Sequence, residues 1–131
     1  MKLVLDTNIY CDFAEGVSQT TDLLATLGDS LHMPTIVIGE LAYGFLKGSR
    51  RSQNEQKLNE IIRLLDIQIV AVTQSVASKY GLIYLSLVQK GRKIPLNDVW
   101  IAACCMEIGG TLLTRDQHFE HVEQIDKMVL A

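Results

Sequence analysis

The sequence predicts an α/β fold around a parallel sheet, because short apolar runs of strand type alternate with longer segments of helical periodicity. The chain has 131 residues, of which 48% are hydrophobic, and this suits one domain with one buried core and excludes disorder. No apolar run approaches the roughly 20 residues needed to span a bilayer. The run after Lys2 is too short for the apolar part of a signal peptide, so we expect a cytoplasmic protein that does not associate with membranes.

In the first half of the chain, residues that favour the start of a helix mark the limits of the expected elements. Asp6 follows an apolar run and is placed to cap the helix that begins there. Pro34 cannot extend a helix backwards, so Thr35 is expected to be the N-cap of the helix that follows. In chain order, we expect a strand over 2–5, helices over about 6–14 and 20–27, a strand over 30–33, and helices over 36–46 and 53–65.

The second half of the chain is bounded in the same way. Thr73 is expected to cap a long helix that Gly91 ends. Asn97 is expected to cap another helix, which Gly109 and Gly110 end. We therefore expect a strand over 67–72, helices over 74–89 and 98–108, a strand over 111–114, one helical turn over 116–119, and an edge strand over 127–130.

Four acidic residues lie within or beside apolar stretches, where an unpaired charge is costly. Two of them, Asp6 and Asp116, each follow an expected buried strand, and ligand sites form at the carboxyl ends of parallel strands. If the fold brings all four together, they repel one another, and a hard cation would satisfy them. The sequence therefore predicts a metal-dependent phosphodiesterase centre made of Asp6, Glu40, Asp98 and Asp116.

Each acid also has a purely structural explanation. Three of the four stand where they could cap or stabilise the helical segment that begins beside them. Glu40 is harder to explain in that way, because its helix is apolar on nearly every face and is expected to be buried. Gly39 and Gly44 weaken that helix, so we expect another backbone to pack closely against them.

The remaining chemistry-bearing residues give weaker indications. The three cysteines have no ligand-like spacing and are interpreted as small buried hydrophobes. His118 and His121 have an i,i+3 spacing that could hold a transition metal. With no further Cys or His cluster nearby, we interpret both histidines as ordinary surface or partly packed side chains.

Basic residues are clustered although the formal net charge is −3, a bulk charge that does not indicate nucleic-acid binding. The clusters, 47–51 and 90–93, each follow an apolar helical stretch. They can be favourable cations at helix C-termini, phosphate clamps beside an acidic centre, or both. The residues expected to contact RNA phosphates in the second interpretation are Arg50, Arg51, Arg92 and Lys93.

Four motifs in a fixed order carry a family resemblance. They are Leu5-Asp6-Thr7-Asn8, Gly39-Glu40-Leu41, Asn97-Asp98-Val99-Trp100-Ile101-Ala102-Ala103 and Leu113-Thr114-Arg115-Asp116. Together they resemble the PIN domain and, more narrowly, the VapC-type toxins of prokaryotic toxin–antitoxin pairs. The similarity covers essentially the whole chain, and residues 94–102 are its most specific part.

The resemblance implies a single nuclease domain over residues 1–131, with a three-layer α/β/α sandwich and a mainly parallel central sheet. It implies a Mg²⁺- or Mn²⁺-dependent endoribonuclease, with a transfer RNA as one plausible target beside ribosomal and messenger RNA. It further implies a homodimer and a cognate antitoxin whose C-terminal segment wraps the active-site groove. The residues that match the family's centre are the acids Asp6, Glu40, Asp98 and Asp116, with Asn8 and Thr114 as supporting hydrogen-bond partners.

Two alternatives from other classes stay open at this point. A phosphotransfer enzyme of the haloacid-dehalogenase type also has an Asp after its first strand, but it usually has a second Asp where this chain has Asn8. A catalytically silent PIN-like module would only bind RNA or assist assembly. Metal-dependent cleavage that is lost when the acids are replaced distinguishes an active nuclease from the silent module.

Overall fold

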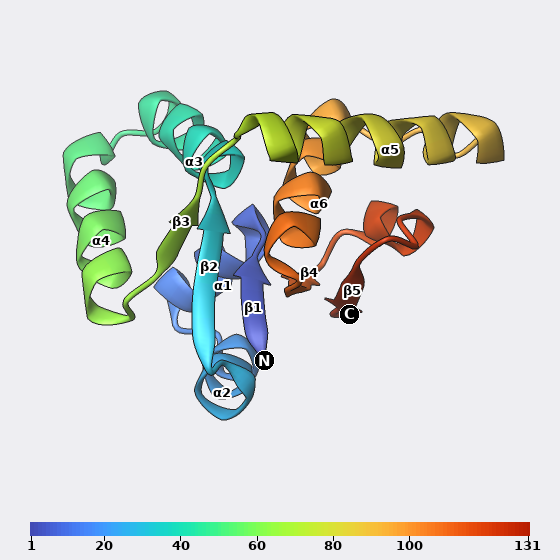
Figure 1. Cartoon of the computed structure of the whole chain (residues 1–131). Coiled ribbons are helices and arrows are strands. Elements are labelled where there is room, and N and C mark those ends of the chain that lie inside the picture. The colour runs from blue at the N-terminus through green and yellow to red at the C-terminus, as the bar shows by residue number, and fades with distance from the viewer.

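The computed structural model describes residues 1–131 and contains a five-stranded sheet in which every neighbouring pair of strands is parallel. The strand order β3-β2-β1-β4-β5 places the first strand of the chain at the centre (Figure 1). In chain order the elements are β1 (Lys2–Leu5), α1 (Thr7–Glu15), α2 (Ser18–Leu27), β2 (Ser30–Pro34), α3 (Thr35–Lys47), α4 (Arg51–Leu64), β3 (Gln68–Val70), α5 (Gln74–Lys90), α6 (Leu96–Ile108), β4 (Thr111–Thr114), the 3₁₀-helix η1 (Gln117–His121) and β5 (Asp126–Val129).

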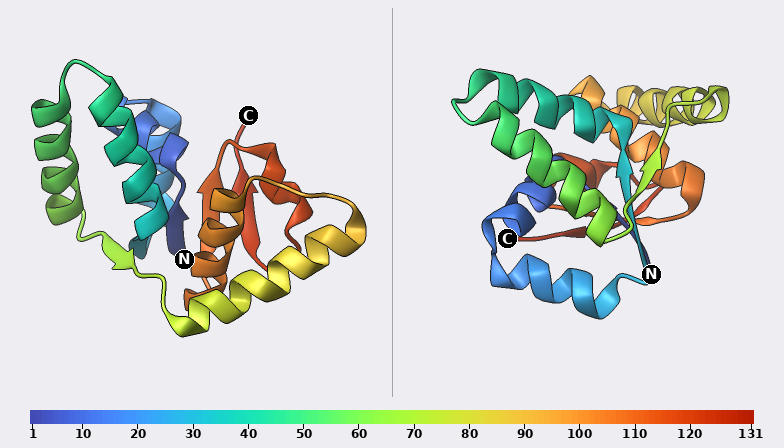
Figure 2. Two further views of the ribbon diagram at one scale, coloured as in Figure 1. Left: turned by 90° about the horizontal axis from the view of Figure 1, so that it is seen from above. Right: turned by 90° about the vertical axis from the view of Figure 1, so that its left-hand side faces the viewer.

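Helices cover both faces of this sheet. Figure 2 shows α1 and α2 on one side and α5 and α6 on the other. The central strands supply the core between them, and Leu3, Val4, Leu112 and Leu113 are fully buried. The predicted α/β fold with a parallel sheet is confirmed. None of the helices is both long and apolar enough to cross a membrane.

The observed helix ends agree with those predicted from the sequence in some places and differ from them in others. Thr73 caps α5 by accepting a hydrogen bond from the amide of Val76, and Gly91 ends α5 in the left-handed conformation, as predicted. The predictions for Thr35 and Asn97 are wrong, because Pro34 and Pro95 occupy the N-cap positions themselves. Proline has no amide hydrogen to donate. The residue before a helix has no partner for an amide hydrogen inside that helix, so a proline fits this position and each helix starts immediately after it.

Helix α3 is less buried than its composition suggests. Val37 and Leu41 face the core, but Tyr43 is 64% exposed and Leu46 is 57% exposed. The expected close packing at Gly39 and Gly44 is also wrong, since an added Cβ at either position would meet no atom within 4 Å. The helix is anchored along one stripe and presents apolar side chains outward.

The sheet topology places segments that are far apart in the sequence side by side at the centre of the sheet. Strands β1 and β4 are neighbours, with Leu5 paired to Leu113, although more than one hundred residues separate them. The chain crosses from β1 to β2 on one side, while β4 pairs with β1 on the other side. Ligand sites of open α/β sheets lie at such a change of direction, outside the carboxyl ends of the strands.

Candidate metal centre

Asp6 stands at the carboxyl end of the central strand and is almost completely buried. It caps α1, with Oδ1 accepting a 2.8 Å hydrogen bond from the amide of Thr7. Its Oδ2 accepts a 2.5 Å bond from the hydroxyl of Thr114, at the end of β4. Burial raises the pKa of Asp6, against the effect of these two bonds, and the nearby charges of Glu40 and Asp116 raise it further.

Glu40 reaches the same place from α3. Its Oε1 accepts a 2.6 Å hydrogen bond from the hydroxyl of Thr7, the first residue of α1. The Glu40 side chain is therefore held at the start of α1, one residue from Asp6. A single threonine connects two of the acids, through its amide to Asp6 and through its hydroxyl to Glu40.

Asp98 lies in the first turn of α6 and is buried. Its burial raises its pKa to about 6, and the charges of Asp116 and Asp6 act in the same direction. The ring of His118 opposes this shift, with Nδ1 at 3.2 Å from Asp98 Oδ2. A carboxylate at the N-terminal end of a helix is favoured by the helix dipole, so α6 helps to hold this acid in place.

Asp116 follows β4 and caps the short helix η1. Its Oδ1 accepts a 2.9 Å hydrogen bond from the amide of His118 and lies 3.0 Å from Nδ1 of the same residue. Its own amide donates to the Thr114 hydroxyl oxygen at 3.0 Å. Thr114 thus donates to Asp6 while accepting from Asp116, which fixes the two strand-end acids relative to each other.

His118 is the one basic side chain that lies among the four acids. No lysine or arginine forms an ion pair with Asp6, Glu40, Asp98 or Asp116. Ligand atoms of Asp98, Asp116 and His118 all lie within 4.8 Å of one another, close enough for one metal ion. The two carboxylates supply oxygen ligands of the kind that Mg²⁺ and Mn²⁺ prefer, and His118 adds a nitrogen, so this donor set fits a divalent cation.

The amino-acid sequence matches one known protein family over most of its length. The family model for the PIN domain matches residues 3–125. This chain belongs to the PIN domain family. Ribonuclease VapC2 of Rickettsia felis is 30% identical over 135 residues, which cover 99% of this chain and 96% of that protein. Ribonuclease VapC1 of Haemophilus influenzae is 29% identical over 136 residues, which cover 95% of each protein. Within the PIN domain family, the chain therefore groups with the VapC ribonucleases.

Solved structures share the fold over the full length of this PIN domain. A structure of VapBC2 from Rickettsia felis, bound to a DNA fragment from its promoter, superposes with a TM-score of 0.85 at 26% identity and covers 100% of both chains. The structure of VapBC-1 from nontypeable Haemophilus influenzae has a TM-score of 0.85 at 20% identity, with 98% of each chain covered. The PIN-like fold expected from the motifs is confirmed.

The other residues singled out in the sequence lie around the centre of this PIN domain at different distances. Asn8 makes its contact with the backbone, accepting a 3.1 Å hydrogen bond from the amide of Arg115, and so ties α1 to the loop after β4. The two basic segments do not lie together. Figure 2 shows the α3–α4 turn and the α5–α6 turn at opposite ends of the molecule. The residues concerned, Arg50, Arg51, Arg92 and Lys93, are all exposed.

Two residues at the acidic centre of this PIN domain were not assigned to it from the sequence. Thr7 belongs to the first motif, but its role became visible only with its bond to Glu40. His118 was expected to be an ordinary surface or partly packed side chain, whereas the structure places its ring against Asp98 and Asp116. His121, three residues later, is exposed and outside this group, so the i,i+3 histidine pair is not the metal-binding unit.

Proposed function

We propose that this PIN domain is a metal-dependent endoribonuclease and the toxin of a toxin–antitoxin pair, acting as one nuclease domain over residues 1–131. The observation that carries the proposal is the convergence of four acids from four elements with no lysine or arginine paired to them. Buried carboxylates without a cation repel one another and each loses hydration. A fold keeps such a group when a bound cation compensates for that cost.

Mg²⁺ or Mn²⁺ is the cation we propose, with Asp6, Asp98 and Asp116 as its principal holders. When bound, it would supply charge neutralisation at the phosphate and a water of lowered pKa. Thr114 holds the Asp6 carboxylate beside the backbone of Asp116, and the His118 amide holds the Asp116 carboxylate, so both side chains are oriented before a cation binds. Preorganised ligands reduce the side-chain entropy that binding would otherwise cost.

Glu40 has a different proposed role, which is to ligate the cation or to orient the attacking water. Its Oε1 is held by the Thr7 hydroxyl, which leaves the second carboxylate oxygen to accept a proton or a hydrogen bond. Attack by water with the 3′-oxygen as the leaving group, rather than attack by the neighbouring 2′-hydroxyl, leaves a 3′-hydroxyl and a 5′-phosphate on the RNA fragments. A 2′,3′-cyclic phosphate end would contradict this mechanism.

RNA would approach across the two basic segments. Arg92 and Lys93 lie in the connection that leads directly into α6 and Asp98. Arg50 and Arg51 lie at the start of α4, where Arg51 also pairs with Glu55 at 2.7 Å. We propose that both segments contact phosphates on either side of the acidic centre and offset its negative field.

Cleavage of total cellular RNA by the purified toxin, with Mg²⁺ or Mn²⁺ and with EDTA, tests the function. Discrete fragments are expected with metal and none with EDTA or with Asp98→Asn. Glu120→Gln is the matched control, because Glu120 is an exposed carboxylate on η1 outside the acidic centre and should keep full activity. No cleavage by a folded, metal-binding protein would favour the silent RNA-binding module.

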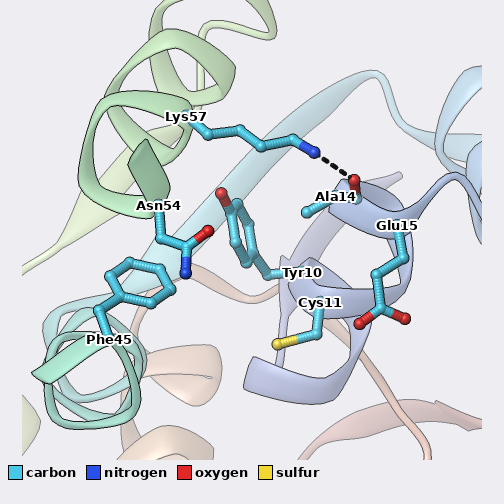
Figure 3. Close-up of a pocket in the computed structure, with 7 residues that line it drawn as sticks. All are labelled: Tyr10, Cys11, Ala14, Glu15, Phe45, Asn54 and Lys57. Atoms are coloured by element: carbon cyan, nitrogen blue, oxygen red, sulfur yellow. Dashed lines mark hydrogen bonds between the residues drawn. The ribbon is translucent and has the colours of Figure 1, made fainter. Parts of the chain in front are cut away.

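The proposed antitoxin site is a cleft between α1 and the α3–α4 hairpin. It encloses about 200 Å³. Figure 3 shows the Tyr10 ring facing Phe45 and Asn54 across it, with Lys57 bridging to the carbonyl of Ala14. One of the solved structures that share this fold is a toxin–antitoxin complex from Klebsiella pneumoniae. An antitoxin segment lying along α1 toward its N-terminus would reach the acids, where a basic side chain would find complementary charge.

Filling this cleft separates antitoxin binding from catalysis. Ala14→Trp should abolish inhibition by the cognate antitoxin and leave RNA cleavage intact. Ala77→Trp is the control, since Ala77 is exposed on α5, away from the cleft. Full inhibition of Ala14→Trp by the antitoxin would place its binding site elsewhere.

A second copy of the chain is proposed to cover α5. Leu82, Leu85 and Val88 are exposed on this helix, and Leu85 and Val88 line a hollow with Tyr80 and Tyr84. Such a patch suits the self-complementary interface of a twofold homodimer. Light scattering should find a dimer that Leu85→Glu converts to a monomer, whereas Leu64→Glu, on α4, should leave it unchanged. A Leu85→Glu dimer would contradict the assignment.

A further inference from the structure

His118 is held over the carboxylates by the turn that carries it. The amide of His118 donates to Asp116 Oδ1 at 2.9 Å, which closes a short loop at the start of η1. That loop returns the imidazole toward the residue two positions earlier, so that Nδ1 lies 3.0 Å from the same oxygen. The position of the ring is therefore set by backbone geometry as well as by its contact with Asp98.

The ring nitrogen has the spacing of a metal ligand. Nδ1 lies 3.0 Å from Asp116 Oδ1 and 3.2 Å from Asp98 Oδ2. An octahedral cation with ligands at about 2.1 Å separates neighbouring ligand atoms by about 3 Å. The two carboxylate–imidazole distances therefore equal those expected between adjacent ligands of one ion.

The exposure of His118 also distinguishes it from a structural side chain. Its side chain is 51% exposed, so packing does not explain its orientation. Its Nε2 forms no hydrogen bond within the chain, while Nδ1 lies within hydrogen-bonding distance of both acids. Bound to a cation, the imidazole would be neutral with its proton on Nε2, and the lone pair of Nδ1 would take the place of the proton that Nδ1 shares with the carboxylates in the metal-free protein.

We propose that His118 Nδ1 is a direct ligand of the divalent cation, so that the centre is a mixed nitrogen–oxygen site that prefers Mn²⁺ to Mg²⁺. This inference rests on the proposed metal-dependent function and deepens it. An all-oxygen site accepts Mg²⁺ well, whereas imidazole favours transition metals, for which affinity increases along the first row from Mn²⁺. His118 would therefore set which metal the enzyme uses, while the acids supply the charge.

Electron spin-echo spectroscopy of the Mn²⁺-loaded protein tests the ligand directly. Mn²⁺ bound through His118 should show nitrogen modulation, which should change frequency when the protein is made with ¹⁵N-histidine. The modulation should disappear in His118→Gln and persist in His121→Gln, a matched control on the same 3₁₀-helix. Bound Mn²⁺ without nitrogen modulation would overturn the inference and leave the acidic metal site intact. A protein that binds no Mn²⁺ at all would overturn both.

Competition between the two cations provides a second readout that is independent of activity. Loss of a residue that only supports a ligand typically costs about 10- to 100-fold in metal affinity, and loss of a ligand itself is expected to cost at least as much. We expect His118→Gln to weaken Mn²⁺ binding by at least about tenfold, and Mg²⁺ binding much less, in calorimetric titrations. Circular dichroism checks that the variant is folded. Equal losses for both cations, or no loss for either, would overturn the proposed selectivity.

Discussion

The hydroxyl of Thr7 lies 2.6 Å from Glu40 Oε1 and donates a hydrogen bond to it, joining the start of α1 to the middle of α3. Glutamate has a long side chain that loses considerable rotamer freedom when it is fixed. Thr7 fixes it in advance, and the amide of the same residue fixes Asp6. The acidic centre therefore depends on a residue that is itself neither an acid nor a base.

Replacement of Thr7 tests this dependence. Thr7→Val keeps the shape of the side chain but removes the donor, so Glu40 becomes free to move. We expect RNA cleavage to fall by about 10- to 100-fold, as for other residues that orient a metal centre. Thr7→Ser keeps the hydroxyl and should retain most of the activity. Equal activity of the Val and Ser variants in single-turnover assays would rule out this role.

Thr114 should matter for stability as well as for activity. Its hydroxyl is fully buried and serves Asp6 and Asp116 at once. Thr114→Val would leave a buried carboxylate and a backbone amide without their partner, at a cost of about 1–3 kcal/mol for each such group. Chemical denaturation should therefore show a clear loss for Thr114→Val and a much smaller one for Thr114→Ser. A Thr114→Val variant as stable as the parent would contradict the bonding described here.

The acidic centre should make the metal-free protein less stable as pH rises. Burial raises the pKa of Asp98 to about 6 from an ordinary value of 3.8, and it raises the pKa of Asp6 as well. Between the two values for Asp98 the folded chain binds more protons than the unfolded chain, so stability falls as pH rises through about 6. For Asp98 the loss amounts to on the order of 3 kcal/mol.

Asp98→Asn isolates this contribution. In EDTA, its melting temperature should exceed that of the parent at about pH 7, and the difference should shrink toward about pH 4. Adding Mn²⁺ should raise the melting temperature of the parent through mass action, and raise that of the variant less. A parent that is more stable than Asp98→Asn at neutral pH in EDTA would show that the carboxylate is not destabilising.

RNA affinity should report on the basic segments through its dependence on salt. Each phosphate contact on a single strand contributes about −0.7 to the slope of log affinity against log salt. Replacing Arg92 and Lys93 with Gln should make the slope shallower by one to two such contacts, and so should replacing Arg50 and Arg51. Arg63→Gln, an exposed position elsewhere on α4, should have no effect. A pair whose replacement leaves the slope unchanged does not contact RNA.

Much of the fold could be predicted from the sequence because its signals are local. A buried strand such as residues 2–5 reads as a continuous apolar run, and Gly91 marks the end of α5 by its left-handed backbone. Strand order is not local, since the central place of β1 depends on pairing with β2 on one side and with β4, more than one hundred residues later in the chain, on the other. The fold class was therefore predictable, while the order of the strands in the sheet was visible only in the structure.

Residues of the acidic centre could be predicted only where the residue type alone indicated a role. Acids in apolar surroundings are conspicuous, whereas a histidine or a threonine at such a place is not. The partner of His118 is Asp98, twenty residues away on another element, and the partner of Thr7 is Glu40, thirty-three residues away. The burial of α3 was overestimated for a related reason, because hydropathy reports how apolar a helix is and not what covers it.

The pairing of β1 with β4 has a consequence during synthesis. Asp6 is translated more than one hundred residues before Thr114 and Asp116, which hold and complete its site. A nascent chain therefore lacks the complete acidic centre until the segment through Asp116 has left the ribosome. A nuclease domain assembled in this order stays inactive while most of its own segment of the message is being translated.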